Sequence, residues 1–296
     1  CRTEHKLSNA IKNKIALFCN VQNEAVIESI DAETIYDVPI LMQKERLDKV
    51  VLKKLGLSTI KSSKMDRWKV FLDKLKNSNK TVKIGLIGKY VELQDSYKSI
   101  LESLTHAGVA NEVKVKIITI HSESINDSNL NELLLKLNGI IVAPGFGERG
   151  IEGKIKAIRY SRENHVPFLG ICLGMQMAVI EYARNVLKLE DVNSTEMKEN
   201  CKNPIISLME NQKSIVNKGG TMRLGAWDCQ LLKKSKTEKI YNKKVISERH
   251  RHRYELNNEY LAQLNKGDLI PSGINPETNL VEVVEHKEHP WFIGVQ

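Results

Sequence analysis

The spacing of apolar residues changes near residue 82, and this change divides the chain into two regions. Beyond it, short apolar runs alternate with segments in which apolar residues recur every three or four positions. The runs predict strands and the periodic segments predict helices. Strands are predicted at 82–88, 113–120, 139–143 and 166–171. A helix is predicted after each strand. The first is capped by Asp95 and Ser96 and stops at Gly108, and the second lies near 128–137. The third runs from the turn 144–150 to about 163, and the fourth covers 173–187.

This alternation predicts an α/β fold, with a mostly parallel sheet flanked by helices and with functional sites at the carboxyl ends of strands. From residue 205 the apolar runs become shorter and the loops more frequent. We expect additional short strands there, in an antiparallel arrangement. The runs concerned are IISLM, TMRLG, WDCQLL, VISERH, LVEVVE and WFIGVQ.

The region before residue 82 has a different pattern. The apolar run KIALFC at 14–19 predicts a buried strand. Residues 39–55 predict a single helix that is entered through Pro39 and stopped by Gly56.

Residues 57–80 are rich in Ser, Lys and Asn but contain an apolar group that includes Trp68 and Phe71. This composition predicts a linker that carries a short amphipathic helix. The sequence is therefore divided into three predicted parts, at 1–56, 57–80 and 81–296.

Composition narrows the class of protein. A hydrophobic content of 41% is typical of a soluble globular protein, and no apolar run has the length of a membrane span or a signal peptide. We expect no membrane association and a cytoplasmic location. The five cysteines include no C-x-x-C pair, so neither a disulfide framework nor a zinc site is predicted.

The net charge of +9 raises the question of nucleic-acid binding. The lysines are spread through almost every segment and aromatic residues make up only 5%, so we expect no nucleic-acid partner. One dense basic cluster, RHRHR at 249–253, predicts a pocket for small anionic groups.

The strongest candidate for chemistry is Cys172, in the segment Gly-Ile-Cys-Leu-Gly between a predicted strand and a predicted helix. A nucleophile on such a turn needs small neighbours, which Gly170 and Gly174 supply. The N-terminus of the following helix should lower the pKa of the thiol and favour the nucleophilic thiolate. The alternative is a buried structural cysteine.

An acyl-transfer site also needs donors for an oxyanion, and a base. The amides of Leu173 and of Gly145, in the turn PGFGERG, are candidate donors, although that segment could equally be a plain tight turn. The eight histidines include no obvious partner for Cys172. His250 and His252 are predicted to line a pocket rather than to act in catalysis.

Several segments together resemble one family, the CTP synthases. G-x-C-x-G-x-Q alone marks only a class I glutamine amidotransferase, whereas GGTMRLG, and RHRHRYE beside NSTE, are specific to CTP synthases. The opening CRTEHKLSNAIKNKIALFCNV resembles the end of that family's amidoligase (synthetase) domain. The matching segments, in chain order, are PGFGERGIEGKIKAIRYSREN, PFLGICLGMQMAVIEYARNVL, NSTEM, GGTMRLG, ERHRHRYELN and HPWFIGVQ.

The resemblance implies a class I glutamine amidotransferase (flavodoxin-like) fold and a role for each matching residue. Cys172 would attack the glutamine amide and form a thioester, with the amides of Gly145 and Leu173 on the oxyanion. Arg253 would hold the α-carboxylate of glutamine. The other residues implied in glutamine binding are Gly174, Met175, Gln176 and Glu196.

This sequence also differs from the family's motifs in places. The family usually has Gly where this chain has Pro144, which removes one amide donor and fixes φ. Phe146 and Arg149 lie where the activator GTP would act. In the family the last strand continues into Phe-His-Pro-Glu-Phe, which carries the His and Glu of the catalytic triad; the sequence ends at Gln296, so we expect this fragment to be a poor glutaminase.

For the whole enzyme the resemblance implies ATP-dependent amination of UTP to CTP, in pyrimidine nucleotide biosynthesis, with Mg²⁺ and with L-glutamine as ammonia donor. No cofactor or metal is expected in this domain, and a homotetramer would form through the synthetase domain. Two other interpretations stay open: another cysteine hydrolase on a similar sheet, or an inactive glutaminase-like module that serves assembly or regulation.

Overall fold

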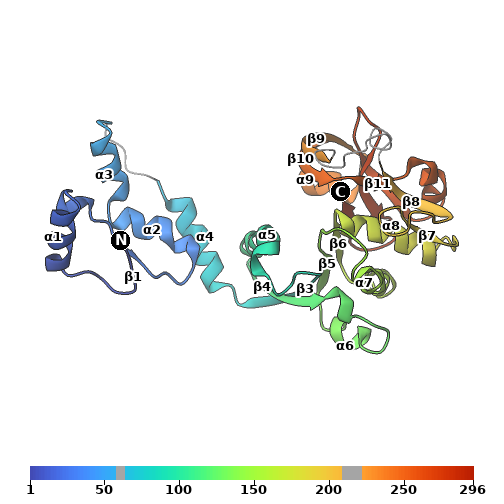
Figure 1. Ribbon diagram of the computed structural model, residues 1–296, viewed down its shortest axis with the longest axis horizontal. Coiled ribbons are helices and arrows are strands. Elements are labelled where there is room, and N and C mark those ends of the chain that lie inside the picture. The colour runs from blue at the N-terminus through green and yellow to red at the C-terminus, as the bar shows by residue number, and fades with distance from the viewer. Residues whose placement is uncertain (58–63, 209–221) are drawn as a thin grey trace. The chain divides into compact units, whose positions relative to one another are not determined.

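The computed structural model describes residues 1–57, 64–208 and 222–296 (Figure 1). They form two compact units: Cys1–Lys80 with Gly108–Val113, and Thr81–Ala107 with Lys114–Gln296. Part of the predicted linker and the first three residues of GGTMRLG lie outside the described residues.

The first unit is mainly helical. Its two short strands, β1 (Arg2–Thr3) and β2 (Ser29–Ile30), pair in parallel. Lys12 and Glu28 form an ion pair beside them, and Glu28 also accepts a hydrogen bond from the Leu7 amide. The helices are α1 (Asn9–Phe18), α2 (Val38–Lys44), α3 (Leu47–Lys54) and α4 (Asp66–Asn77).

Two predictions for this unit are wrong. The run 14–19 belongs to helix α1 rather than to a buried strand, because Ser8 caps the helix by accepting a hydrogen bond from the Ile11 amide. Its end is not buried: Leu17 is 78% exposed and Phe18 77% exposed.

The single helix predicted over 39–55 is two helices, α2 and α3. Arg46 adopts a left-handed φ of 60° between them, which breaks the helical hydrogen-bond pattern. The stop at Gly56 is as predicted, since α3 ends at Lys54. The amphipathic helix predicted in the linker is α4, whose Trp68 packs on Phe71 with a centroid distance of 5.4 Å.

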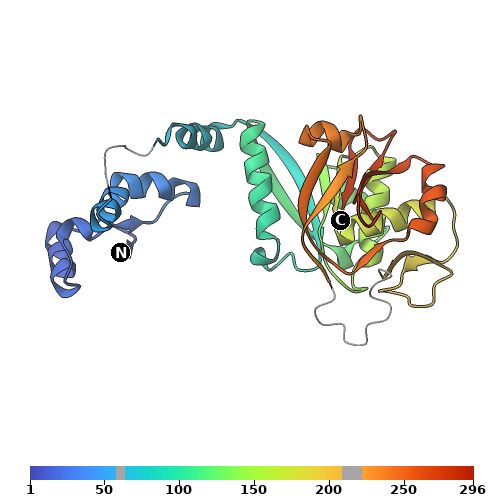
Figure 2. The ribbon, with the colours of Figure 1, turned by 90° about the horizontal axis from the view of Figure 1, so that it is seen from above.

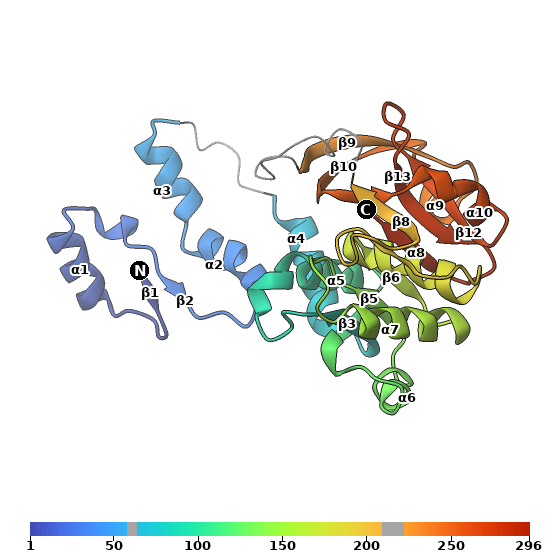
Figure 3. The ribbon, with the colours of Figure 1, turned by 45° about the vertical axis from the view of Figure 1, so that its right-hand side comes forward.

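A nine-stranded sheet forms the framework of the second unit, in the order β10-β9-β12-β13-β14-β6-β5-β3-β4. The pairs β3–β5, β5–β6 and β6–β14 are parallel, and the pairs from β14 through β13, β12 and β9 to β10 are antiparallel (Figure 3). The predicted mixed α/β architecture is therefore confirmed. Its strands are β3 (Lys80–Gly88), β4 (Val113–His121), β5 (Gly139–Val142), β6 (Phe168–Ile171), β9 (Arg223–Leu231), β10 (Val245–His252), β12 (Leu269–Ile274), β13 (Val281–His286) and β14 (Phe292–Val295).

Helices cover the sheet on both faces (Figure 2). On one face Leu86 and Ile141 pack against α5 (Lys98–Ala110). On the other, Ile140 and Phe168 belong to a larger core with α7 (Ile151–Glu163) and α8 (Leu173–Asn185). The remaining helices are α6 (Leu130–Leu134), α9 (Lys236–Tyr241) and α10 (Leu261–Asn265), and the short 3₁₀ segments are Asn23–Ala25, Ile35–Asp37, Gln94–Tyr97, Ser122–Ser124 and Asn258–Tyr260.

The helix predicted to stop at Gly108 continues to Ala110, because Gly108 is buried inside the helix. A 3₁₀ turn, rather than a side-chain cap from Asp95 or Ser96, precedes it. TMRLG and WDCQLL, predicted as two strands, join in the single strand β9, which pairs along its length with β10.

A second, three-stranded sheet lies in the same unit. Its order is β11-β8-β7, with β11 (Tyr254–Leu256) antiparallel to β8 (Asn203–Leu208) and β7 (Val192–Ser194) parallel to β8. The chain thus passes from one sheet to the other between β10 and β11, at Arg253. In the part of the chain that the structure describes, none of the helices is both long and apolar enough to span a membrane.

Candidate active site

Cys172 occupies the sharp turn between the end of β6 and the first residue of α8. Its backbone is strained, with φ 53° and ψ −106°, and its amide donates a hydrogen bond of 2.7 Å to the Val295 carbonyl on β14. The turn therefore places the thiol at the carboxyl end of the parallel strands, where the sequence predicted it.

The two glycines that flank this turn are required by close backbone contacts. A Cβ on Gly170 would lie 2.6 Å from the Gly174 carbonyl carbon, and a Cβ on Gly174 would lie 2.2 Å from the Val142 oxygen. No side chain fits at either distance, so the predicted need for small neighbours is confirmed.

The electrostatics of the thiol differ from the sequence prediction. Burial raises the pKa of Cys172 to about 11, and a hydrogen bond from the Leu173 backbone lowers it only in part. The charges of Glu196 and Glu255 raise this pKa further, while Lys154 lowers it. The expected net lowering by the helix N-terminus is therefore wrong for this structure. Cys172 is nevertheless only partly buried, unlike Cys229 in the core.

The turn that carries Gly145 lies against the start of α8. A Cβ on Gly145 would be 3.4 Å from Cδ2 of Leu173 and 3.7 Å from Nζ of Lys154. Lys89 supports the same turn by donating a hydrogen bond to the Phe146 carbonyl. The structure thus brings together the two segments predicted to supply oxyanion donors.

The side chains predicted to bind glutamine gather around Tyr254. Gln176, 3% exposed, donates a 3.0 Å hydrogen bond from Nε2 to the Tyr254 carbonyl. The charges of Glu196 and Arg253 both act on the pKa of Tyr254, which burial raises. The charge of Glu196 therefore acts on both Tyr254 and Cys172.

Glu196 is held by the turn that carries Gly145. Its Oε1 accepts a 2.7 Å hydrogen bond from the Gly147 amide. At the opposite side, Gln296 Nε2 lies 3.8 Å from Cys172 Sγ and its Oε1 lies 3.4 Å from Gln176 Nε2. The nucleophile therefore has amide and carboxylate groups near it from several separate segments.

Two of the predicted substrate-binding residues have a packing role. Gly174 lies against Val142, and Met175 is fully buried beneath β14, where a Cβ on Gly294 would lie 3.0 Å from its Cβ. Contact of their backbones with glutamine stays a prediction.

Phe146 and Arg149 lie on the exposed part of the same turn. Phe146 is 46% exposed. Arg149 forms a 2.8 Å ion pair with Glu123, and its guanidinium lies 5.6 Å from the ring centroid of Tyr90. An anionic ligand at Arg149 would have to compete with Glu123.

Sequence reasoning missed Lys154, which is fully buried near Cys172. Its Nζ has no hydrogen-bond partner among the described residues, and burial, with the charge of Lys89, lowers the pKa of Lys154 to about 8. A signal was present: Lys154 follows the helical spacing of the buried Ile151, Ile155 and Ile158.

The prediction that His250 and His252 line a pocket is wrong. Both are buried, at 6% and 2% exposure, because they alternate along β10 and face the interior. There they contact Glu282 and Glu255.

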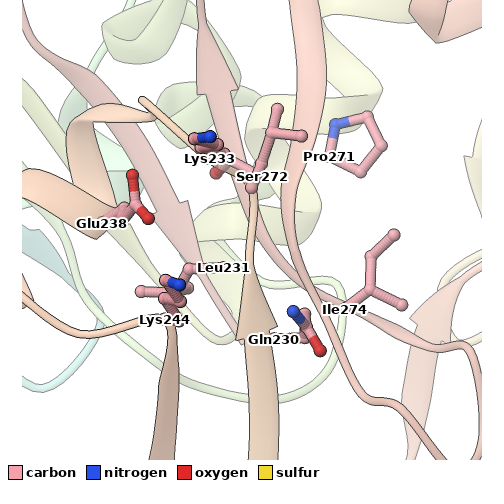
Figure 4. A pocket seen from close by; sticks show the side chains of 9 residues that line it. Gln230, Leu231, Lys233, Glu238, Lys244, Pro271, Ser272 and Ile274 are labelled. Atoms are coloured by element: carbon pink, nitrogen blue, oxygen red, sulfur yellow. The ribbon is translucent and has the colours of Figure 1, made fainter.

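A separate cavity of about 420 Å³ lies between β9, β12 and α9 (Figure 4). None of the predicted site residues lines it. Its wall includes Leu231, Pro271 and Ile274 together with charged side chains such as Lys233 and Glu238. Chemistry at Cys172 therefore does not use this cavity.

The charges around Cys172 predict opposite effects of two substitutions on its reactivity. Glu196→Gln removes a charge that raises the thiol pKa, so alkylation by iodoacetamide at pH 8 should become faster; Lys154→Met should make it slower. In the unsubstituted chain the rate should rise about tenfold per pH unit up to about pH 11. The measurement is mass spectrometry of the Cys172 peptide, with the exposed Cys19 as internal reference. A shift of both variants in the same direction would contradict this account.

The strained nucleophile turn, the glycine turn beside it and the mixed sheet define a class-I glutamine amidotransferase. Residues 92–296 match the family model described as glutamine amidotransferase class-I, and the chain belongs to this family. Residues 1–57 match the model described as CTP synthase N-terminus. Within the amidotransferases, the chain belongs to the CTP synthases.

The relatives support this assignment over the full chain. The chain is 63% identical over 296 residues to a CTP synthase of Christiangramia forsetii and 61% identical to one of Flavobacterium johnsoniae, in alignments that cover 100% of it. It spans about half the length of these relatives, 54% and 55%. A solved glutaminase domain of Trypanosoma brucei CTPS with bound acivicin is 37% identical, with a TM-score of 0.67, over 73% of this chain and 84% of that one.

Proposed function

We propose that this chain hydrolyses glutamine at Cys172 and supplies ammonia for the amination of UTP to CTP. The observation that carries the proposal is the strained backbone of Cys172, held at the carboxyl end of the sheet beside Gln176, Glu196 and the Gly145 turn. This arrangement suits attack on an amide carbonyl, which needs an aimed nucleophile and converging amide donors.

In the proposed reaction, the Cys172 sulfur forms a bond to the side-chain amide carbon of glutamine. The tetrahedral oxyanion accepts hydrogen bonds from the amides of Leu173 and Gly145, and collapse of the intermediate releases ammonia. Water then cleaves the thioester to give glutamate and the free thiol. We assign the base to the His of the family's Phe-His-Pro-Glu-Phe motif, since the raised pKa of Cys172 calls for one.

Glutamine would be held at its head group by Gln176, Glu196 and Arg253. The backbones of Gly174 and Met175 would also contact it. Glu196 suits the α-ammonium because it is a carboxylate, and Arg253 suits the α-carboxylate because a guanidinium donates two parallel hydrogen bonds. These charges require a substrate that carries both groups, as a free amino acid does.

The second half of the proposed activity concerns the whole enzyme. ATP, Mg²⁺ and UTP would act in the synthetase domain, to whose C-terminal part residues 1–56 would belong, joined by the linker 57–80. In the described ranges no group of three or more His, Cys, Asp or Glu side chains is placed to hold a metal ion, so we derive no step through Mg²⁺ from this chain. GTP would act at Phe146 and Arg149, and the enzyme would be a cytoplasmic tetramer.

Covalent labelling tests the proposal directly. The intact enzyme, incubated with a diazo-ketone analogue of glutamine, should gain one adduct at Cys172, and excess glutamine should protect it. The glutaminase domain of Trypanosoma brucei CTPS was solved with acivicin bound. A folded protein that gains no adduct would favour the inactive module, and an adduct at another cysteine would remove the assigned nucleophile.

Arg253→Ala should raise the KM for glutamine by about 100-fold while kcat changes little, because a bound carboxylate would lose its charged partner. Steady-state glutaminase kinetics measure both constants. Arg251→Ala, two residues earlier on the exposed side of β10, is the matched control and should leave the KM unchanged. An unchanged KM in Arg253→Ala would mean that the carboxylate binds elsewhere.

A further inference from the structure

Five buried polar side chains form a closed ring beside the proposed glutamine site. His250 Nε2 lies 3.1 Å from Glu282, His250 Nδ1 lies 2.8 Å from His252 Nε2, and His252 Nδ1 lies 3.3 Å from Glu255. Arg223 closes the ring, with Nη1 at 2.6 Å from Glu282 and 3.5 Å from Glu255. The side chain of each member is at most 3% exposed.

Burial shifts pKa values within this ring. Burial lowers the pKa of His250 to about 4 and that of His252 to about 3, so both are neutral at neutral pH. Burial raises the pKa of Glu255 to about 8 and also raises the pKa of Glu282, while the charge of Arg223 lowers both. Arg223 forms its shorter ion pair with Glu282. Two of the links are hydrogen bonds, between His250 and His252 and from Arg223 to Glu255. The others are close contacts of Glu282 with Arg223 and His250, and of His252 with Glu255.

The ring has members on both sides of the point at which the chain changes sheets. His252 is the last residue of β10 in the nine-stranded sheet, and Glu255 belongs to β11 in the three-stranded sheet. Their contact therefore ties together the two sides of Arg253 and Tyr254. On the other side of this segment, the Tyr254 carbonyl accepts the hydrogen bond from Gln176.

A buried charge network of this kind is weak support for stability, since apolar residues of similar volume often stabilise a core as well or better. Its better-documented use is to select one arrangement of the backbone. Here the arrangement that it selects is the bend at Arg253, because two of its five members are the chain neighbours of that bend.

We propose that the ring of Arg223, His250, His252, Glu255 and Glu282 is a positioning device that fixes Arg253 to receive the α-carboxylate of glutamine. The inference rests on the proposed function and adds residues that never touch the substrate. Opening the ring should weaken glutamine binding and leave the chemistry at Cys172 intact.

The test uses two buried glutamates of the same strand. Glu282 belongs to the ring, whereas Glu285 accepts hydrogen bonds from Lys236 and Thr237 at the start of α9. Each is 3% exposed, so Glu282→Gln and Glu285→Gln replace equally buried carboxyl groups. In an intact enzyme that also carries Cys172→Ala, calorimetric titration with glutamine should show a Kd at least tenfold higher for Glu282→Gln and unchanged for Glu285→Gln.

Kinetics with Cys172 present provide the second readout. Glu282→Gln should raise the KM for glutamine and leave kcat within about twofold, and combining it with Arg253→Ala should add nothing to the KM of Arg253→Ala alone. Should Glu282→Gln fail to fold, His250→Gln opens the ring without removing a charge and should give the same result.

The outcomes separate the two proposals. An equal Kd for Glu282→Gln and the parent, or equal losses for both glutamate variants, overturns the positioning role. Additive effects with Arg253→Ala overturn the claim that the ring acts through Arg253. Glutamine hydrolysis that persists in Cys172→Ala overturns the proposed function instead.

Discussion

Cys172→Ala is expected to lower the kcat for glutamine hydrolysis by about 10⁴-fold or more, because no covalent intermediate can form without the sulfur. A coupled assay for glutamate measures the loss in the intact enzyme. The substitution removes one atom from a turn whose strain is set by backbone contacts, so the fold should persist.

Cys201→Ala is the matched control, since Cys201 is also a partly buried thiol and lies in the connection between β7 and β8. Its activity should equal that of the parent. Glutamine turnover by Cys172→Ala, or an equal loss in Cys201→Ala, would contradict the assignment of the nucleophile.

Gly174→Ala is expected to destabilise the second unit by about 3 kcal/mol or more, since the added methyl would lie 2.2 Å from the Val142 carbonyl oxygen. Relief requires α8 to move away from β5, and both elements belong to the main core. Urea denaturation followed by circular dichroism measures the free energy of unfolding.

Gly145→Ala provides the comparison for stability. Its Cβ would meet no atom closer than 3.4 Å, so a loss below about 1 kcal/mol is expected. Equal destabilisation by the two alanine substitutions would show that the contact with Val142 does not set the packing of α8.

The strands and helices of the second unit were predictable because their apolar patterns are local. β5 and β6 are continuous apolar runs between turns, β3 is mostly apolar from Val82 onward, and α8 follows its strand directly. The nucleophile turn was predictable for a related reason: Gly170 and Gly174 are needed by contacts within the same strand-turn-helix unit and its neighbour β5.

Features that depend on distant parts of the chain were not predictable. The ring was missed because it needs the register that places His252 opposite Arg223, and a strand, β13, that joins the sheet much later in the chain. The thiol pKa was mispredicted because the sequence shows the helix that follows Cys172 but not the burial around it. The run 14–19 was misassigned because apolar content alone does not distinguish a short strand from a helix with one exposed end.

The hydrogen bond from the Cys172 amide to the Val295 carbonyl has a consequence for synthesis on the ribosome. Strand β14 is inserted between β13 and β6, and Gln296 beside Cys172 is 124 residues later in the chain. Chains are made from the N-terminus at about 5–20 residues per second, so the sheet around the nucleophile stays incomplete for several seconds after Cys172 has been made. A nascent chain therefore carries the Cys172 thiol before the Val295 carbonyl, which accepts the hydrogen bond of the Cys172 amide, has been made.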